Sequence, residues 1–107
     1  MKQLSPLELQ QWLADASRAA PLLLDVREPH EYALCHIADS RLIPLNELPA
    51  RSDELDRDAE IVAICHHGMR SFRAGSFLEQ AGFARVYNLQ GGVDAWAHDV
   101  DPGMARY

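Results

Sequence analysis

One uninterrupted apolar segment constrains the fold of this chain more than any other: residues 61–65, with the sequence IVAIC. It is rich in β-branched residues and lacks polar alternation, so it predicts a central strand covered on both faces. Short strand-like segments alternate with helix-like ones along the rest of the chain. The strands are expected over residues 22–26, 42–45, 61–65 and 85–89, with helical segments between and after them. This alternation predicts an α/β domain with a largely parallel sheet.

Local signals predict several helix boundaries. Ser5, Pro6 and Glu8 form a capping box with proline at the first helical position. Asn46 is expected to cap a helix that runs towards Leu55. A longer helix is expected from about residue 69 to residue 81, with a buried apolar face formed by Phe72, Phe77, Leu78 and Ala81.

Composition limits the class of protein and its partners. The length of 107 residues fits one domain over residues 1–107, and 48% hydrophobic residues is typical of a globular fold. A net charge of −6 argues against a nucleic-acid partner, because phosphate contacts need a surplus of Lys and Arg. No apolar run approaches the roughly 20 residues that span a bilayer, and the polar start is unlike a secretory signal. We therefore expect no membrane partner and a cytoplasmic location.

Cysteine and histidine spacing predicts neither a disulfide scaffold nor a metal site. Two cysteines are too few for a disulfide-stapled fold, and no CxxC motif is present. A zinc site would need convergence of Cys35, His36, Cys65, His66 and His67. These residues come in adjacent groups, and adjacent side chains on a strand point to opposite faces. We therefore expect no metal.

The end of the central strand and the start of the next helix bring reactive groups together. Cys65 closes the strand, and Arg70 and Ser71 lie near the start of the helix. The short loop between them, which contains Gly68, can turn its backbone N–H groups inward as an anion-binding nest. The helix dipole adds partial positive charge there, which favours the thiolate form of a cysteine at the rim of the nest.

The residues alone leave two interpretations of this segment open. Cys65 is either a small buried apolar residue, the usual role of a cysteine at the end of such a strand, or a thiolate that handles anions. His66 and His67, taken singly, are expected to be loop or surface residues, and at most one of them faces the pocket. Trp12 is expected in the core, and Tyr107 at a frayed chain end.

Several segments together resemble the signatures of the rhodanese family. They are residues 24–32 (LDVREPHEY), 36–37 (HI), 43–45 (IPL), 65–71 (CHHGMRS) and 89–96 (LQGGVDAW). Their order and spacing match over about residues 4–98, which is nearly the whole chain. The sequence departs from the family at Cys35, where Gly is frequent, and at residues 38–40.

The resemblance implies a single rhodanese domain with a core at about residues 4–98 and a five-stranded, largely parallel sheet with helices on both faces. It also implies a thiosulfate sulfurtransferase, which moves sulfane sulfur from thiosulfate or a similar small anionic donor to cyanide or a thiol. Cys65 matches the cysteine that becomes a persulfide. The loop whose amides cradle that persulfide is matched by His66, His67, Gly68, Met69, Arg70 and Ser71. The chemistry requires no metal and no organic cofactor, and a sulfur-relay protein is a candidate partner.

Other signature positions are assigned to the scaffold by the same resemblance. They are Asp25, Arg27, Glu31 and His36. Cys35 is either a structural substitution or a resolving thiol that reduces the Cys65 persulfide by forming a disulfide.

Two further functions stay open at this point. Phosphatases of related fold, and arsenate reductases with them, hold an oxyanion in a Cys-x5-Arg loop. Here four residues separate Cys65 from Arg70, and the shorter loop favours sulfur over phosphorus. A non-enzymatic persulfide carrier or docking module in a sulfur relay would also keep Cys65.

Overall fold

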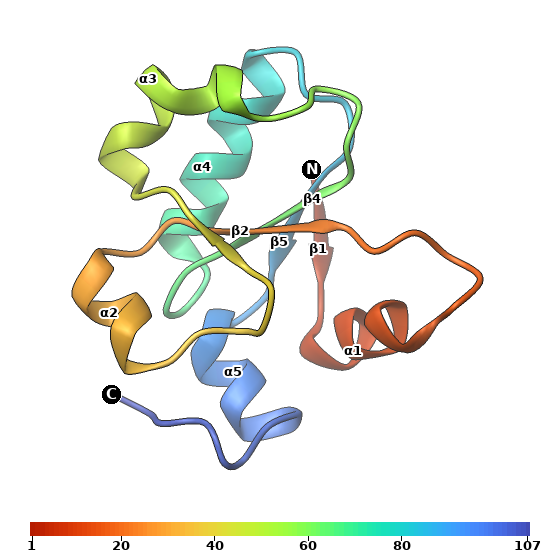
Figure 1. Ribbon diagram of the computed structural model, residues 1–107, viewed down its shortest axis with the longest axis vertical. Helices are drawn as coiled ribbons and strands as arrows, with labels where there is room; N and C mark the ends of the chain where they lie inside the picture. Colours follow the sequence, from red (N-terminus) through yellow and green to blue (C-terminus); the bar gives the residue numbers. More distant parts are fainter.

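The computed structural model describes residues 1–107 and contains one five-stranded sheet in which all neighbouring strands are parallel (Figure 1). The strands are β1 (Lys2–Leu4), β2 (Leu22–Asp25), β3 (Arg41–Leu42), β4 (Ile61–Ile64) and β5 (Val86–Leu89). Their spatial order is β1-β5-β4-β2-β3. The apolar segment that begins at Ile61 is therefore confirmed as the central strand, with β5 on one side and β2 on the other.

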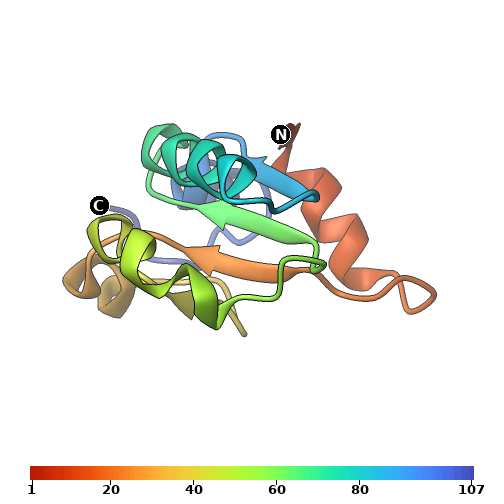
Figure 2. The same ribbon diagram turned by 90° about the horizontal axis from the view of Figure 1, so that it is seen from above.

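The helices surround this sheet (Figure 2). They are α1 (Pro6–Ala14), α2 (Pro29–Leu34), α3 (Leu48–Arg51), α4 (Met69–Gln80) and α5 (Gly92–Asp99), with 3₁₀ turns η1 (Leu45–Glu47) and η2 (Ser52–Glu54) on either side of α3. The predicted capping box of α1 is confirmed, because the Ser5 hydroxyl accepts from the Glu8 N–H and the Glu8 carboxylate from the Ser5 N–H. None of the helices is long and apolar enough to span a membrane.

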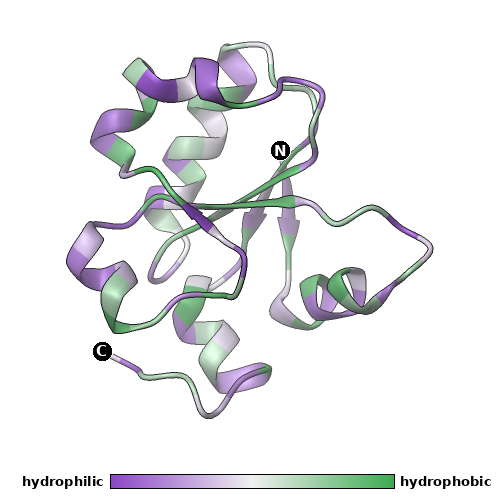
Figure 3. Ribbon diagram, viewed as in Figure 1, coloured by the Kyte–Doolittle hydropathy of each residue, from purple (hydrophilic) through white to green (hydrophobic).

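Successive residues of β4 pack into two separate cores, one on each face of the sheet. On one face, Ile61 packs in a cluster with Ala74 and Leu78 of α4. On the other face, Val62 and Ile64 pack with residues of α1 and α5: Leu9, Trp12, Val93 and Trp96. Figure 3 shows the inner strands β2 and β4 as predominantly hydrophobic, whereas the edge strands β1 and β3 carry hydrophilic residues. The predicted rhodanese-like arrangement, a parallel sheet covered on both faces, is confirmed, as is the burial of Trp12.

The strand β1 has no counterpart in the apolar pattern of the sequence. Its sequence, KQL, is short and mostly polar. Its place at the sheet edge comes from pairing with β5, where Gln3 lies opposite Asn88. The fifth strand therefore depends on a contact between segments far apart in the sequence.

A helical segment does run towards Leu55 as predicted, but it is not one regular helix, and the predicted cap at Asn46 is wrong. The chain makes η1, α3 and η2 in succession, and the first turn is capped by Pro44 without a side-chain hydrogen bond. Pro49 lies in the first turn of α3 and has no N–H to donate to a preceding carbonyl. The segment is therefore divided into short turns.

The predicted buried face of α4 is correct for Leu78 but wrong for Phe72, which is 50% exposed. The buried residues of α4 are mostly small: Ser71, Ala74, Gly75 and Leu78. A Cβ at Gly75 would lie 3.3 Å from Val86 of β5, so close packing on the sheet selects small side chains over aromatic ones.

Candidate active site

The segments that follow β2, β4 and β5 meet at the carboxyl edge of the sheet, where parallel α/β folds bind ligands. Residues 65–68 connect β4 to α4 and carry Cys65. The segment after β2 leads into α2, which carries Glu31, and the segment after β5 leads into α5. This edge is the candidate active site.

Cys65 lies at the floor of its loop. Its sulfur accepts a hydrogen bond from the Gly68 N–H at 3.0 Å and lies 3.2 Å from the Ser71 hydroxyl oxygen. The residue is only 1% exposed, and it lines none of the cavities of the molecule. The sulfur therefore lies beneath the loop and not at the rim of the nest, where we expected it.

Ser71 connects the sulfur to Asn88, a residue that the sequence motifs did not single out. The Ser71 hydroxyl donates to Asn88 Oδ1, and Asn88 Nδ2 donates to the Gly68 carbonyl at 3.2 Å and to Gln3 Oε1 at 3.1 Å. A hydroxyl has one proton, so the thiol proton of Cys65 is the donor in the contact with Ser71. The one sequence feature that could have indicated a role for Asn88 is its polar side chain inside the strand-like segment 85–89.

Glycines allow the loop and α5 to approach each other closely. The N–H groups of Val93 and Asp94 donate to the carbonyls of Cys65 and His66, at 2.9 and 3.1 Å. A Cβ at Gly92 would lie 2.4 Å from each of those carbonyl oxygens. The first turn of α5 therefore holds the segment after β4 in place through its backbone, and this contact requires Gly92.

The start of α4 supplies the remaining backbone donors. Gly68 precedes the helix with φ +105°, a left-handed conformation that suits glycine. The N–H groups of Met69, Arg70 and Ser71 belong to the first helical turn and have no acceptor within the helix. Together with the Gly68 N–H that already contacts the sulfur, they make this end of α4 electropositive.

Arg70 is fixed by Glu31 of α2. Its two terminal nitrogens donate to the two carboxylate oxygens at 2.6 and 2.9 Å. This bidentate bond lowers the pKa of Glu31 and raises the pKa of Arg70. Glu31, which the resemblance assigned to the scaffold, is thus a direct partner of the loop.

Tyr107 also packs against the site, so the expected frayed end is wrong. Its hydroxyl donates to Glu31 Oε2 at 2.8 Å and accepts from Arg27 at 2.9 Å. Its ring stacks on His66, with centroids 3.9 Å apart and an interplanar angle of 8°. Burial raises the pKa of Tyr107 to about 12. The C-terminal residue therefore joins α2 to the loop, and Figure 1 shows the chain ending beside α2.

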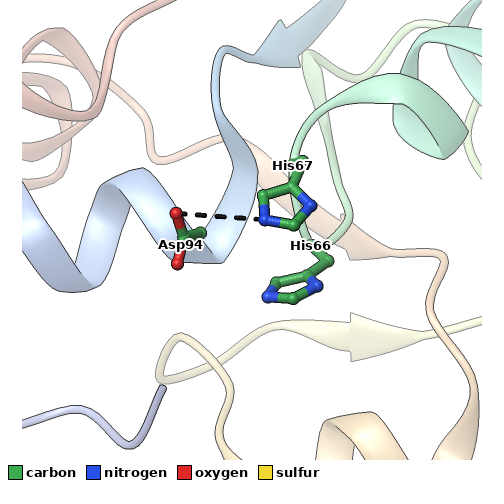
Figure 4. Close-up of side chains that lie close together, drawn as sticks. All are labelled: His66, His67 and Asp94. Atoms are coloured by element: carbon green, nitrogen blue, oxygen red, sulfur yellow. Dashed lines mark ion pairs between the residues drawn. The ribbon is translucent and has the colours of Figure 1, made fainter. Parts of the chain in front are cut away.

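The two loop histidines lie on the same side of the chain (Figure 4). Their rings stack with centroids 3.9 Å apart, and the other stacking partner of His66 is Tyr107. Burial, followed by repulsion from His67, lowers the pKa of His66. His67 is exposed and lines a cavity of about 490 Å³ beside the loop. The argument that adjacent histidines point apart does not hold, because both lie beyond the end of β4.

A family model, the rhodanese-like domain, matches residues 5–99 of this sequence. The chain belongs to the rhodanese family. A crystal structure of a rhodanese-related protein from Thermoplasma volcanium superposes on this rhodanese domain with a TM-score of 0.84 at 33% identity, covering 94% of each chain. The fold and the family predicted from the sequence are both confirmed.

Several curated relatives of this rhodanese domain are named sulfurtransferases. A sulfurtransferase of Allochromatium vinosum is 40% identical over 97 residues, which cover 91% of this chain and 89% of that protein. The thiosulfate sulfurtransferase GlpE of Stutzerimonas stutzeri is 36% identical over 75% of this chain and 73% of its own length. The probable adenylyltransferase/sulfurtransferase MoeZ of Mycobacterium tuberculosis is 36% identical over 97% of this chain, which spans only 26% of that protein.

The second cysteine of this rhodanese domain has different neighbours from Cys65. Cys35 is the residue that caps the end of α2, and its sulfur lies 3.9 Å from a terminal nitrogen of Arg27. The carbonyl of Cys35 accepts from the same guanidinium at 2.7 Å. Both cysteines are free thiols.

Proposed function

We propose that this rhodanese domain, over residues 1–107, is a thiosulfate sulfurtransferase that carries sulfane sulfur as a persulfide on Cys65. The observation that carries the proposal is the cysteine sulfur held by the Gly68 N–H at the electropositive start of α4. The thiosulfate specificity of the named relative GlpE supports the choice of donor. Two free cysteines fit a reducing compartment such as the cytoplasm.

The reaction needs a thiolate and no oxidant. The Cys65 thiolate attacks the outer sulfur of thiosulfate, a new S–S bond forms, and the bond to the sulfonate sulfur breaks so that sulfite leaves with the electron pair. Cyanide or a thiol then attacks the outer sulfur of the persulfide and regenerates the thiolate. A hydrogen bond to a charged group contributes about 1.5–3 kcal/mol, so the backbone donors of the loop stabilise the thiolate and the anionic persulfide alike.

The loop side chains position the donor. Arg70 uses two N–H groups on Glu31, which leaves the rest of its guanidinium fork for an oxyanion. Because the ion pair fixes the direction of Arg70, we assign it to orienting the sulfonate group. His66, His67 and Met69 complete the loop around the sulfur by the family pattern.

Sulfur relay to a protein is the second candidate, and one observation favours it. Met69 and Phe72 lie on the first turn of α4, beside the Cys65 loop, and are 75% and 50% exposed. Both line the cavity of about 490 Å³ that His67 and Gly68 also line. An apolar surface next to the reactive loop suits a protein acceptor better than cyanide.

The decisive experiment compares Cys65→Ala with Cys35→Ala. Each protein is incubated with thiosulfate, the peptide containing residue 65 is examined by mass spectrometry for one extra sulfur, and thiocyanate is measured after cyanide is added. We expect wild type and Cys35→Ala to load sulfur and to form thiocyanate, and Cys65→Ala to do neither while keeping the wild-type circular dichroism spectrum.

Thiocyanate formation by folded Cys65→Ala would refute the proposal. A loaded peptide that persists in the presence of cyanide would favour the relay. A disulfide between residues 35 and 65 after thiosulfate treatment would make Cys35 a resolving thiol. Release of phosphate from an ester without any sulfur transfer would favour the phosphatase alternative.

A further inference from the structure

Three side chains with metal-binding atoms converge at the outer side of the Cys65 loop. They are His66, His67 and Asp94, and one ligand atom from each lies within 4.8 Å of the others (Figure 4). The two histidines come from the segment after β4, and Asp94 comes from the first turn of α5. The sequence argument excluded a different set, which combined these histidines with the cysteines.

The three ligand atoms are available. His66 Nε2 is the one buried side-chain nitrogen or oxygen of the whole chain that has no hydrogen-bond partner. An unpartnered buried polar atom costs free energy unless something binds it. Asp94 Oδ1 accepts from Arg106 at 3.0 Å, which leaves Oδ2, and Oδ2 lies 4.0 Å from His67 Nε2.

The backbone already holds the two halves of this cluster together. The Asp94 N–H donates to the His66 carbonyl at 3.1 Å, so the backbone segments that carry the carboxylate and the imidazoles stay adjacent. Bonds of 2.0–2.2 Å from zinc to nitrogen and oxygen place tetrahedral ligands ~3.4 Å apart. The ligand atoms lie within 4.8 Å of one another, so they must approach by up to about 1.4 Å when an ion binds, and the His67 ring is exposed and can rotate.

We propose that His66, His67 and Asp94 bind a divalent transition-metal ion of the Zn²⁺ or Co²⁺ type, with a further coordination position open to water or a small anion. Two imidazoles and a carboxylate suit these ions better than Mg²⁺ or Ca²⁺, which prefer oxygen ligands alone. A bound ion joins the Cys65 loop to α5 through side chains as well as backbone. The site does not depend on the proposed sulfur transfer.

The test uses Co²⁺ as the probe, added to the full chain after treatment with a chelator. We expect visible d–d absorption that saturates at an equimolar ratio, no thiolate-to-cobalt charge-transfer band, and loss of the signal when Zn²⁺ is added. His67→Ala and Asp94→Asn should each weaken Co²⁺ binding by about tenfold or more. His98→Ala is the matched control, since His98 pairs with Asp99 at 2.6 Å on the exposed side of α5 and has no third ligand.

Three outcomes would overturn the metal site. They are Co²⁺ absorption that does not saturate, equal affinity in wild type, His67→Ala and Asp94→Asn, and a charge-transfer band that places the ion on a cysteine. Because binding is measured by absorption and without sulfur transfer, failure here leaves the proposed function untouched.

Discussion

The segments that follow β2 and β4 occupy neighbouring positions at the same sheet edge. They differ in how many of their hydrogen-bonding groups have a partner within the protein. After β2, the fully buried guanidinium of Arg27 donates to Asp25 at 2.8 and 2.9 Å, to the Cys35 carbonyl at 2.7 Å and to Tyr107 at 2.9 Å. After β4, the first-turn amides of α4 lack helical acceptors, and His66 Nε2 has no partner.

This difference separates a structural segment from a reactive one. The N–H groups of the Arg27 guanidinium donate to acceptors of the protein itself. The segment after β2 therefore stabilises the fold and offers few free donors to a ligand. The segment after β4 keeps its donors around a sulfur that, in the proposed reaction, is negatively charged both as thiolate and as persulfide. Glu31 connects the two segments, since it binds both Arg70 and Tyr107.

The largest expected effect is on stability, from Arg27→Met. It leaves the buried carboxylate of Asp25 without its partner, and breaking a buried ion pair in this way costs about 3–5 kcal/mol. The free energy of unfolding, from urea denaturation, checks this. Arg41→Met, which removes a partly exposed partner of Glu54, should unfold close to wild type. Equal stability of the two variants would contradict the structural role of the segment after β2.

A smaller effect on stability, with a larger one on activity, is expected from Gly92→Ala. The new Cβ meets the carbonyls of Cys65 and His66 at 2.4 Å, and the residue has φ +61°. The strained residue should cost about 1–3 kcal/mol. Displacement of the loop from α5 should reduce thiosulfate:cyanide turnover by roughly tenfold to a hundredfold. Gly103→Ala, where φ is not positive and the nearest atom is 3.5 Å away, should keep wild-type turnover. Full activity of Gly92→Ala would contradict the inference that contact with α5 positions the Cys65 loop.

The smallest expected effect is the pH dependence that Glu31 gives to the free energy of unfolding. Arg70 lowers the pKa of Glu31 in the folded state, so the ion pair contributes fully above the unfolded pKa of about 4.3 and is lost as the pH falls below that value. Glu31→Gln should therefore be less stable than wild type at pH 7, by about 1 kcal/mol, and the gap should narrow towards pH 3. Urea denaturation at both pH values measures this. If the difference in the free energy of unfolding between wild type and Glu31→Gln increased towards pH 3, the lowered pKa of Glu31 would be contradicted.

Local patterns predicted the features that depend on neighbouring residues. The capping box at Ser5, the central strand from Ile61 and the start of α4 at Met69 follow from spacing and propensity, and the motif around Cys65 indicated the family. These signals need no knowledge of distant partners.

The features that the sequence did not predict depend on contacts between distant segments. Glu31 and Arg70 are 39 residues apart, and Glu31 and Tyr107 are 76 apart. Asn88 reaches the loop because β5 pairs with β4, where Asn88 lies opposite Ala63. The side chains of His66 and Asp94 meet because α5 packs on the loop, which no helical or strand periodicity encodes.

The hydrogen bonds of Ser71 differ between the thiol and the thiolate form of Cys65. While Cys65 keeps its proton, the Ser71 hydroxyl is free to point at Asn88. Once the sulfur is an anion, the hydroxyl must turn towards it, and the amide oxygen of Asn88 loses its hydrogen bond from Ser71. The charge on the Cys65 sulfur therefore changes the hydrogen bonding of Asn88 through rotation of the Ser71 O–H bond. The Asn88 side chain also donates to Gln3 Oε1 at the sheet edge. Vibrational spectra of an isotope-labelled Asn88 amide should therefore distinguish the thiol from the thiolate of Cys65.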